Sequence, residues 1–436
     1  MFRRRFLRFE LPNRLRCAVA VLPILICTNL PAQIREWPQF RGPAGQGVVD
    51  DVSLPIKWDE EDGVVWKVDI PGLGHSSPVH NGETIWVTTA TEDGRILGAV
   101  SINAATGSIE QNLTIFEPDA VEEIHHDNSY ASPTPVLSGD RLFAHFGTYG
   151  TACIDCRSGR KLWERTDLPV EHQGGPGSSP VLYEDLLIIT LDGAQEQKLV
   201  ALDTSDGSTR WTRNRSAPFR TNPITHRAFS TPLICESGGK RQLISTGADQ
   251  CHAYSPDDGS ELWHIRYTGF SNVPRPVVMD DTVFICTGFF QPEIWAVPTN
   301  GSGELERSNR IWSHKSSVPD TPSPVVVESD DAAIVVMVSN KGIVTALDAS
   351  TGKQAWKLRI GGNFSSSPIS AGGLLYFCSE EGVTKIVDPH LSKPRIIQAN
   401  RLPGRIMASP VVIDQDLLIR TESSLYRISD EGDRKD

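Results

Sequence analysis

A short motif recurs eight times along the 436-residue chain: a small or polar residue, a proline and then an apolar run. Typical copies read HSSPVH, GSSPVL and MASPVV, and they follow one another at intervals of 42 to 57 residues. A repeat of this length is typical of folds in which each copy is one supersecondary unit packed on its neighbours. The repeated prolines are Pro78, Pro135, Pro180, Pro232, Pro276, Pro324, Pro368 and Pro410.

A second element lies between the prolines, where an Asp–Gly turn precedes a tryptophan. It reads LDTSDGSTRW at 202–211 and LDASTGKQAW at 347–356, with Asp and Trp eight positions apart. Glycine supplies the positive φ of such a turn, and the Trp offers a large apolar face and an N–H to the next unit. The tryptophans assigned to this structural role are Trp66, Trp163, Trp211, Trp263, Trp312 and Trp356.

Each unit reads as four short strands, because apolar runs such as LLIIT and KLVALD alternate with polar turns. Four strands per 40–50 residues is the pattern of a propeller blade, as in WD40- and YVTN-like repeats. No segment has convincing helical periodicity. The repeat therefore predicts an all-β, eight-bladed β-propeller of four-stranded blades over residues 58–430, with each proline at the entry to an inner strand.

The two ends of the repeat region complement each other. The last unit stops after a third strand at 423–429, whereas a strand at 64–72 (VVWKVDIPG) stands alone before the first unit. We expect this N-terminal strand to pair with the C-terminal blade and close the ring, because closure removes an exposed sheet edge. Residues 33–57 are predicted to be an N-terminal arm too rich in Gly and Pro for regular structure, and 431–436 a polar tail.

Residues 1–32 have the character of an export signal. A basic stretch (MFRRRFLR) precedes an apolar segment (CAVAVLPILICTNL) that is too short to span a bilayer, and Ala32 suits a cleavage site. The arginines leave both the general secretory and the twin-arginine route open. We therefore expect an exported protein of the periplasm or cell envelope.

The Trp-bearing frame resembles the repeats of pyrroloquinoline-quinone-type (PQQ-like) propellers. That superfamily includes the quinoprotein alcohol dehydrogenases and the propeller lipoprotein of the outer-membrane β-barrel assembly machinery. The resemblance covers roughly residues 58–430 and implies the fold. It does not by itself imply an activity, because the repeat residues serve blade packing.

Charge and cysteine content exclude some functions. Without residues 1–32, 36 Lys and Arg stand against 53 Asp and Glu, a net charge of −17, which argues against nucleic acid as a partner. Cys153 and Cys156 form a CxxC with no second copy, so they and the other cysteines after residue 32 are predicted to be small core residues. No transmembrane segment is predicted after residue 32, and we expect a monomer.

Chemistry is expected at the central funnel, on the face where the chain enters each inner strand. Residues just before the repeat prolines should surround its mouth, and they give a basic, amide-rich lining suited to a small anionic or polyhydroxylated ligand. The predicted ligand-binding residues are His75, His125, His126, Asp127, Asn128, Tyr130, His172, Gln173, Arg227, Asn272, Arg275, Asp320, Asn363 and Arg405.

Two functional interpretations follow. The first is a binding or scaffolding module without assigned catalytic residues, whose partner is an envelope protein or such a small ligand. The alternative is an oxidoreductase. If it is quinoprotein-like, the resemblance implies PQQ with calcium, adjacent cysteines and a Trp floor, and the sequence has no Cys–Cys pair. If it is metal-dependent, His125, His126 and Asp127 are the candidate ligands, although no metal is assigned.

Overall fold

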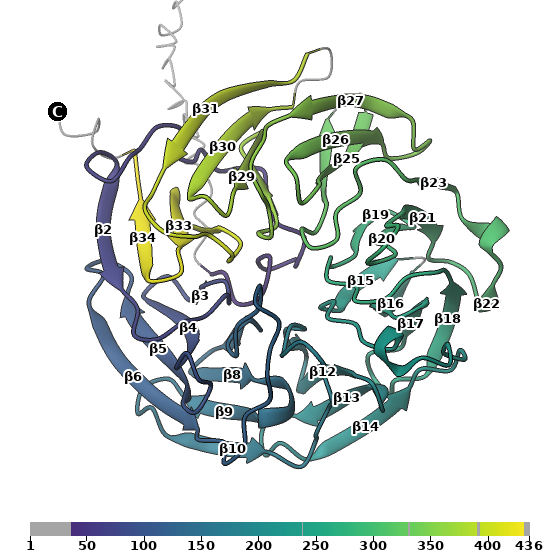
Figure 1. Cartoon of the computed structure of the whole chain (residues 1–436), viewed down its shortest axis with the longest axis horizontal. Coiled ribbons are helices and arrows are strands. Elements are labelled where there is room, and N and C mark those ends of the chain that lie inside the picture. The colour runs from purple at the N-terminus through teal and green to yellow at the C-terminus, as the bar shows by residue number, and fades with distance from the viewer. Residues whose placement is uncertain (1–35, 238, 330–331, 390–392, 431–436) are drawn as a thin grey trace, which may run out of the picture. The chain divides into compact units, whose positions relative to one another are not determined.

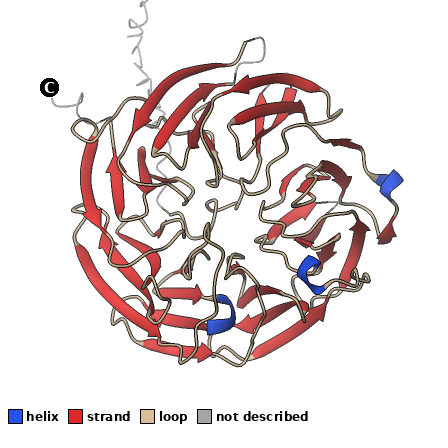
Figure 2. Cartoon of the chain, in the orientation of Figure 1, coloured by secondary structure: helices blue, strands red, loops and turns tan. Residues whose placement is uncertain are grey.

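The computed structural model describes residues 36–237, 239–329, 332–389 and 393–430. The predicted signal peptide and polar tail lie outside these ranges. The described residues belong to one compact unit, in which eight sheets stand around a central axis (Figure 1). Nearly all regular structure is strand, and the short exceptions are 3-10 helices (Figure 2). These are η1 (Gly147–Tyr149), η2 (Pro223–Thr225) and η3 (Arg307–Asn309).

Blades 1 to 4 follow one another along the chain. Blade 1 contains β3 (Val79–His80), β4 (Thr84–Ala90), β5 (Leu97–Asn103) and β6 (Ile109–Phe116). Blade 2 contains β7 (Val136–Ser138), β8 (Arg141–His145), β9 (Thr151–Asp155) and β10 (Lys161–Arg165). Blade 3 contains β11 (Val181–Tyr183), β12 (Leu186–Asp192), β13 (Gln197–Asp203) and β14 (Thr209–Asn214). Blade 4 contains β15 (Leu233–Ser237), β16 (Lys240–Gly247), β17 (Gln250–Tyr254) and β18 (Glu261–Arg266).

Blades 5 to 8 complete the ring. Blade 5 contains β19 (Val277–Met279), β20 (Thr282–Cys286), β21 (Ile294–Pro298) and β23 (Trp312–His314). Blade 6 contains β24 (Val325–Ser329), β25 (Ala332–Val338), β26 (Ile343–Asp348) and β27 (Gln354–Arg359). Blade 7 contains β28 (Ile369–Ala371), β29 (Leu374–Cys378), β30 (Val383–Asp388) and β31 (Arg395–Arg401). Blade 8 contains β32 (Val411–Ile413), β33 (Asp416–Arg420), β34 (Ser424–Ile428) and β2 (Val64–Asp69).

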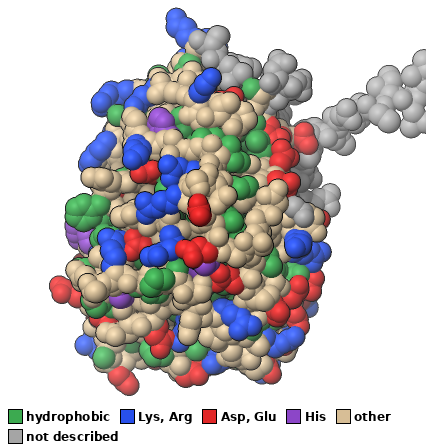
Figure 3. All heavy atoms as spheres, turned by 90° about the vertical axis from the view of Figure 1, so that its right-hand side faces the viewer, with side chains coloured by type: hydrophobic (Ala, Val, Ile, Leu, Met, Phe, Trp, Pro, Cys, Tyr) green, Lys and Arg blue, Asp and Glu red, His purple; other side chains and the backbone are tan. Residues whose placement is uncertain are grey.

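The predicted propeller and its closure are confirmed. Every repeat proline stands directly before the inner strand of a blade. Strand β2 pairs antiparallel with β34, so the first strand of the ring completes the last blade. On the opposite side of the ring, the short strand β22 (Gly303–Leu305) pairs with the outer edge of blade 4. Acidic and basic side chains alternate over that side of the unit (Figure 3).

Four of the six frame tryptophans connect neighbouring blades. The indole N–H groups of Trp66, Trp163, Trp211 and Trp312 each donate to a carbonyl oxygen in the Asp–Gly turn of the next blade, at 2.9–3.1 Å. The glycine of this turn packs against the indole ring of the tryptophan. At Gly207, which has φ +75°, a Cβ would stand 2.7 Å from the Trp163 ring. Both the conformation and the space therefore require glycine.

Trp263 and Trp356 depart from this pattern. Trp263 donates to the Gln242 side chain within its own blade, and the Trp356 N–H has no partner in the described part of the chain. All six cysteines after residue 32 are free thiols. Four of them, including Cys153 and Cys251, are buried as predicted, whereas Cys156 and Cys235 are only partly buried. Burial raises the pKa of Cys251 to about 12, so the thiol stays protonated.

The described part of the arm, residues 36–57, has little regular structure, as expected, but it contains one short strand and is packed against the ring. Its strand β1 (Val48–Val49) pairs parallel with the inner strand β28, and Trp37 bridges to His80 of blade 1. Trp37 is completely buried. The arm therefore lies near the centre of the ring against the inner strands, where it blocks the axis (Figure 1).

Polar contacts fix the arm to several blades. The buried guanidinium of Arg41 donates to the carbonyl oxygens of Pro324 (2.8 Å) and Pro368 (3.2 Å). The Gln46 side chain accepts from the Val278 N–H at 2.7 Å. These partners are backbone groups on inner strands or at their entries, so the arm satisfies polar groups that an open channel would leave to water.

None of the helices among the described residues is long and apolar enough to cross a membrane.

Candidate functional site

A cavity of about 670 Å³ opens at one end of the axis, above the arm. The entries to the inner strands of all eight blades line it, and the arm residue Phe40 forms part of its floor. Three hairpins between second and third strands add Phe289, Lys341 and Glu380. Because the chain alternates direction in each blade, these hairpins and the entries share one face of the ring.

A ring of hydroxyl groups surrounds the base of the cavity. Seven of the eight repeat prolines are preceded by Ser or Thr. In each case the hydroxyl oxygen accepts a hydrogen bond from the backbone N–H of the equivalent residue in the preceding blade, at 2.9–3.2 Å. Each hydroxyl accepts in these bonds and keeps its own proton available for donation. The members are Ser77, Thr134, Ser179, Thr231, Ser323, Ser367 and Ser409.

Arg275 occupies the eighth position and breaks the ring. It was predicted at the funnel mouth, but its side chain is fully buried. The guanidinium turns into the propeller and donates to the carbonyl oxygens of Pro232 (2.8 Å) and Phe40 (2.6 Å). The prediction for Arg275 is therefore wrong in location, because register fixes the position of a residue on a strand but not the direction of a long side chain. Through its hydrogen bond to Phe40, Arg275 binds the arm to the ring.

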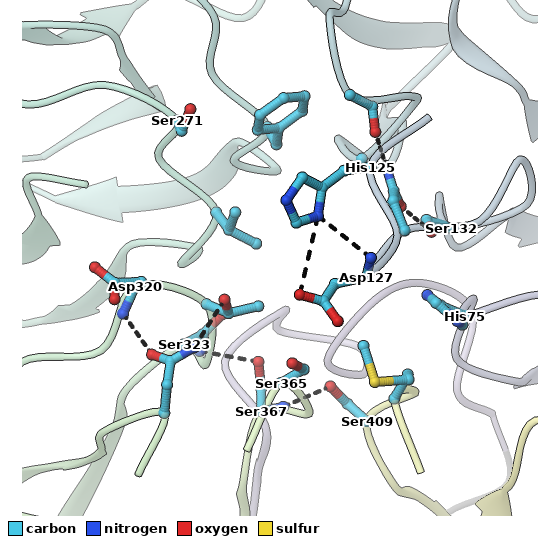
Figure 4. A pocket seen from close by; sticks show the side chains of 18 of the residues that line it. His75, His125, Asp127, Ser132, Ser271, Asp320, Ser323, Ser365, Ser367 and Ser409 are labelled. Atoms are coloured by element: carbon cyan, nitrogen blue, oxygen red, sulfur yellow. Dashed lines mark hydrogen bonds and ion pairs between the residues drawn. The ribbon is translucent and has the colours of Figure 1, made fainter. Parts of the chain in front are cut away.

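An ion-paired cluster bounds one side of the cavity. Arg405 donates to Asp127 (3.0 Å) and to Glu380 (2.7 Å), which joins blades 8, 2 and 7. Although partial burial opposes it, the Arg405 hydrogen bond and the nearby histidines lower the pKa of Asp127. His125 and Asp127 reach over the cavity from the same loop (Figure 4), with His125 Nδ1 3.9 Å from the carboxylate.

The opposite side of the cavity carries Arg227, Lys341 and Asp320. Arg227 donates to the Gln173 carbonyl oxygen (2.7 Å) and to Ser271 (2.9 Å), and Lys341 to the Asn363 side chain (2.9 Å). The Oδ1 atom of Asp320 is buried without a hydrogen-bond partner in the described chain, and burial raises the pKa of this carboxyl.

The structure brings eight of the predicted residues together in the cavity wall. These are His75, His125, Asp127, Asn128, Gln173, Arg227, Asp320 and Asn363. Arg405 belongs to the same site through its ion pairs, and His126 lies just outside, with Nε2 3.2 Å from Asp127.

The remaining predicted residues are buried below the surface. Tyr130 donates its hydroxyl to the Glu122 carbonyl oxygen at 2.8 Å. Asn272 donates to the Tyr267 hydroxyl and the Cys286 carbonyl oxygen. His172 packs near Phe229, with ring centroids 6.5 Å apart. With Arg275, these side chains support the loops and do not line the cavity.

The cavity is not basic, which corrects the expectation. Arg227 and Lys341 in its wall and Arg405 beside it balance the three carboxyl groups of the wall, which belong to Asp127, Asp320 and Glu380. Burial, together with the charges of Arg420 and Arg405, lowers the pKa of His75 to about 4, so this imidazole adds no charge at neutral pH. Neutral hydroxyl and amide groups dominate the rest of the lining.

Sequence reasoning missed two parts of the site. Phe40 of the arm gives no repeat signal, because it lies in a Gly- and Pro-rich segment with a single copy. The hydroxyl ring did have a signal, since Ser or Thr before a proline recurs in seven copies. That pattern could have been interpreted as a chain of side chain–backbone hydrogen bonds between blades.

The eight-bladed fold and its repeat define a PQQ-like β-propeller. Over residues 58–240 and 234–432, the chain matches the family described as outer membrane protein assembly factor BamB, and it belongs to that family. A curated BamB of Burkholderia pseudomallei (strain K96243) is 24% identical over 191 residues, which is 44% of this chain and 44% of that relative. The chain therefore spans less than half the length of that relative.

Solved structures show the same fold. BamB from Moraxella catarrhalis matches with a TM-score of 0.54 at 14% identity, over 84% of this chain and 99% of that one. A europium-containing methanol dehydrogenase matches with a TM-score of 0.65 at 11% identity, over 92% of this chain and 99% of that chain. At such identities the likeness supports the fold alone.

The lining does not fit the quinone site that the family resemblance implies. Such a site would have adjacent cysteines and a tryptophan floor. Here neither a cysteine nor a tryptophan is among the residues that line the cavity, and Phe40 and the hydroxyl ring take the place of the floor. No reaction step is therefore derived through that cofactor.

Proposed function

We propose that this chain is an exported binding module of the periplasm or cell envelope, and that the cavity face is its recognition face. One observation carries the proposal: side chains from all eight blades converge on a single polar cavity. A closed ring holds these loops rigidly, and rigid scaffolds with side chains on loops are suited to recognition. The export signature of residues 1–32 and the name of the family, an outer membrane protein assembly factor, support the envelope as the place of action.

The composition of this face favours a protein segment as the partner. A lining of hydroxyls and amides with balanced charges recognises polar groups by hydrogen bonding and has little net attraction for an anion. Beside it, Phe289 and Phe290 are exposed, Phe290 to 78%. Phe290 also has φ +85°, which is uncommon for an aromatic residue and is found at functional sites. Exposed aromatics beside polar groups are typical of protein interfaces.

Paired substitutions on the two faces test the proposal. The double variant Phe290→Asp/Lys341→Glu alters the cavity face. The matched control Ile109→Asp/Lys353→Glu alters the other face, at the first residue of β6 and in the turn between β26 and β27. We expect capture of envelope proteins from membrane extract to fall about tenfold or more in the first variant and to match the unmodified protein in the second. Equal capture by both variants would contradict the proposal.

A further inference from the structure

A second group of ligating side chains lies apart from the cavity, in blade 4. Among the described residues, His252, Glu261 and His264 place one donor atom each within 4.8 Å of one another. None of the three lines the cavity.

The sheet holds this group in place. His252 of β17 and His264 of β18 are direct partners in the antiparallel ladder, so both imidazoles project from the same face of the blade. The register shifts between Ala253 and Tyr254, and this irregularity brings Glu261 beside the two rings. The ring centroids of the histidines are 5.1 Å apart. Two rigid strands, and not a mobile loop, therefore set the spacing of the donors.

The polar atoms of the group are directed at one another. Glu261 Oε1 is 2.6 Å from His264 Nδ1, and Oε2 is 3.7 Å from His252 Nε2. Ser216, from the chain that leaves blade 3, lies 2.6 Å from Glu261 Oε2 and 3.2 Å from His252 Nε2. His252 is fully buried, yet its second nitrogen, Nδ1, has no partner in the described structure. Nε2, the nitrogen that faces Glu261 and Ser216, is the donor that His252 offers to this group.

We propose that His252, Glu261 and His264 form a binding site for a borderline transition-metal dication, with Zn²⁺ as the ion of choice. Two imidazole nitrogens and one carboxylate oxygen are a usual zinc donor set, and water or Ser216 can fill a fourth position. Donors about 2.0–2.1 Å from zinc stand about 3.3 Å apart in a tetrahedron. The three donors lie within 4.8 Å of one another, and Glu261 would have to release its 2.6 Å hydrogen bond with His264 to coordinate an ion.

The site would connect two blades. His252 and the carboxylate belong to blade 4, whereas Ser216 follows the outer strand of blade 3. A bound ion would therefore stabilise the contact between blades 3 and 4, and it would act independently of recognition at the cavity face.

Metal titration of the purified protein tests this site. After treatment with a chelator, the protein is titrated with Zn²⁺ against a chromophoric competitor, and with Co²⁺ as a spectroscopic probe. We expect one equivalent of Zn²⁺ to bind and to raise the melting temperature. In Glu261→Gln and His264→Gln the affinity should fall about 100-fold or more, since even loss of a group that only hydrogen-bonds to a metal ligand costs about 10–100-fold.

The exposed cluster at the cavity provides the matched control. His125→Gln/His126→Gln removes two histidines of similar spacing next to Asp127 and should leave the zinc affinity unchanged. Glu261→Gln keeps the size of the side chain, so it carries the comparison if His264→Gln does not fold. Absence of stoichiometric zinc, binding that survives both blade 4 variants, or loss of binding in the control would each overturn the proposal.

Discussion

The imidazole of His172, which is buried below the cavity, makes the stability of the protein depend on pH. Neither ring nitrogen has a hydrogen-bond partner in the described structure, and Gly147 leaves it little room: a Cβ there would stand 2.3 Å from Nε2. Burial lowers the pKa of this imidazole to about 4 from an ordinary value near 6.5. The folded protein therefore holds His172 neutral in a range where the unfolded chain takes up a proton.

This difference predicts an acid-dependent loss of stability. The stabilising contribution of the neutral ring is complete above about pH 6.5 and is lost progressively as the pH falls from there to about 4. When the pH falls from 7 to 4.5, the free energy of unfolding should decrease in both proteins. We expect the decrease to be about 2.5 kcal/mol smaller in His172→Leu than in the unmodified protein. Urea unfolding at both pH values measures this, with exposed His126→Leu as the control. Equal losses in all three proteins would contradict the assignment.

The role of a single residue could be predicted from the sequence where local backbone conformation or packing alone determines the residue type. The turn glycines and the tryptophans of the frame follow from backbone conformation and packing, and these demands are local. Arg275 shows the limit. It stands at the same repeat position as seven Ser or Thr residues, but its length allows it to reach the carbonyl oxygen of Phe40, which is distant in sequence.

At the scale of elements, the arm is the main departure from the repeat. Its single strand β1 has two residues, and its other contacts are spread over several blades. No periodic pattern predicts such a segment, because its partners are non-local. The blades, in contrast, were predictable because each is built from neighbouring strands and marked by its own proline.

The arm should contribute strongly to stability. We expect Trp37→Ala to lower the free energy of unfolding by about 3–5 kcal/mol, since the ring is completely buried at the axis. Ile56→Ala in the same arm is the control; Ile56 is 42% exposed, and its loss should cost less than about 0.5 kcal/mol. Denaturant titration distinguishes the two. A Trp37→Ala protein as stable as the control would show that the arm does not pack on the axis.

Two features characterise the whole molecule: the ring of blades is closed, and its two faces differ. Pairing of β2 with β34 leaves no open sheet edge between the first and last blades. The two faces of the ring then differ: one carries the cavity, and the other carries the hairpins between first and second strands and the Asp–Gly turns. Sequence register was enough to predict which loops share a face, but the charge balance of the cavity depended on side-chain directions and was mispredicted.

Photo-crosslinking from two lysines of blade 6 tests the recognition face most directly. Lys341 lies between β25 and β26 at the cavity, and Lys353 lies between β26 and β27 on the other face. A photoreactive amino acid placed at either position in intact cells samples the partners of each face. We predict discrete adducts with envelope proteins from position 341 and none from position 353. Adducts from 353 alone, or the same adducts from both positions, would contradict a recognition face at the cavity.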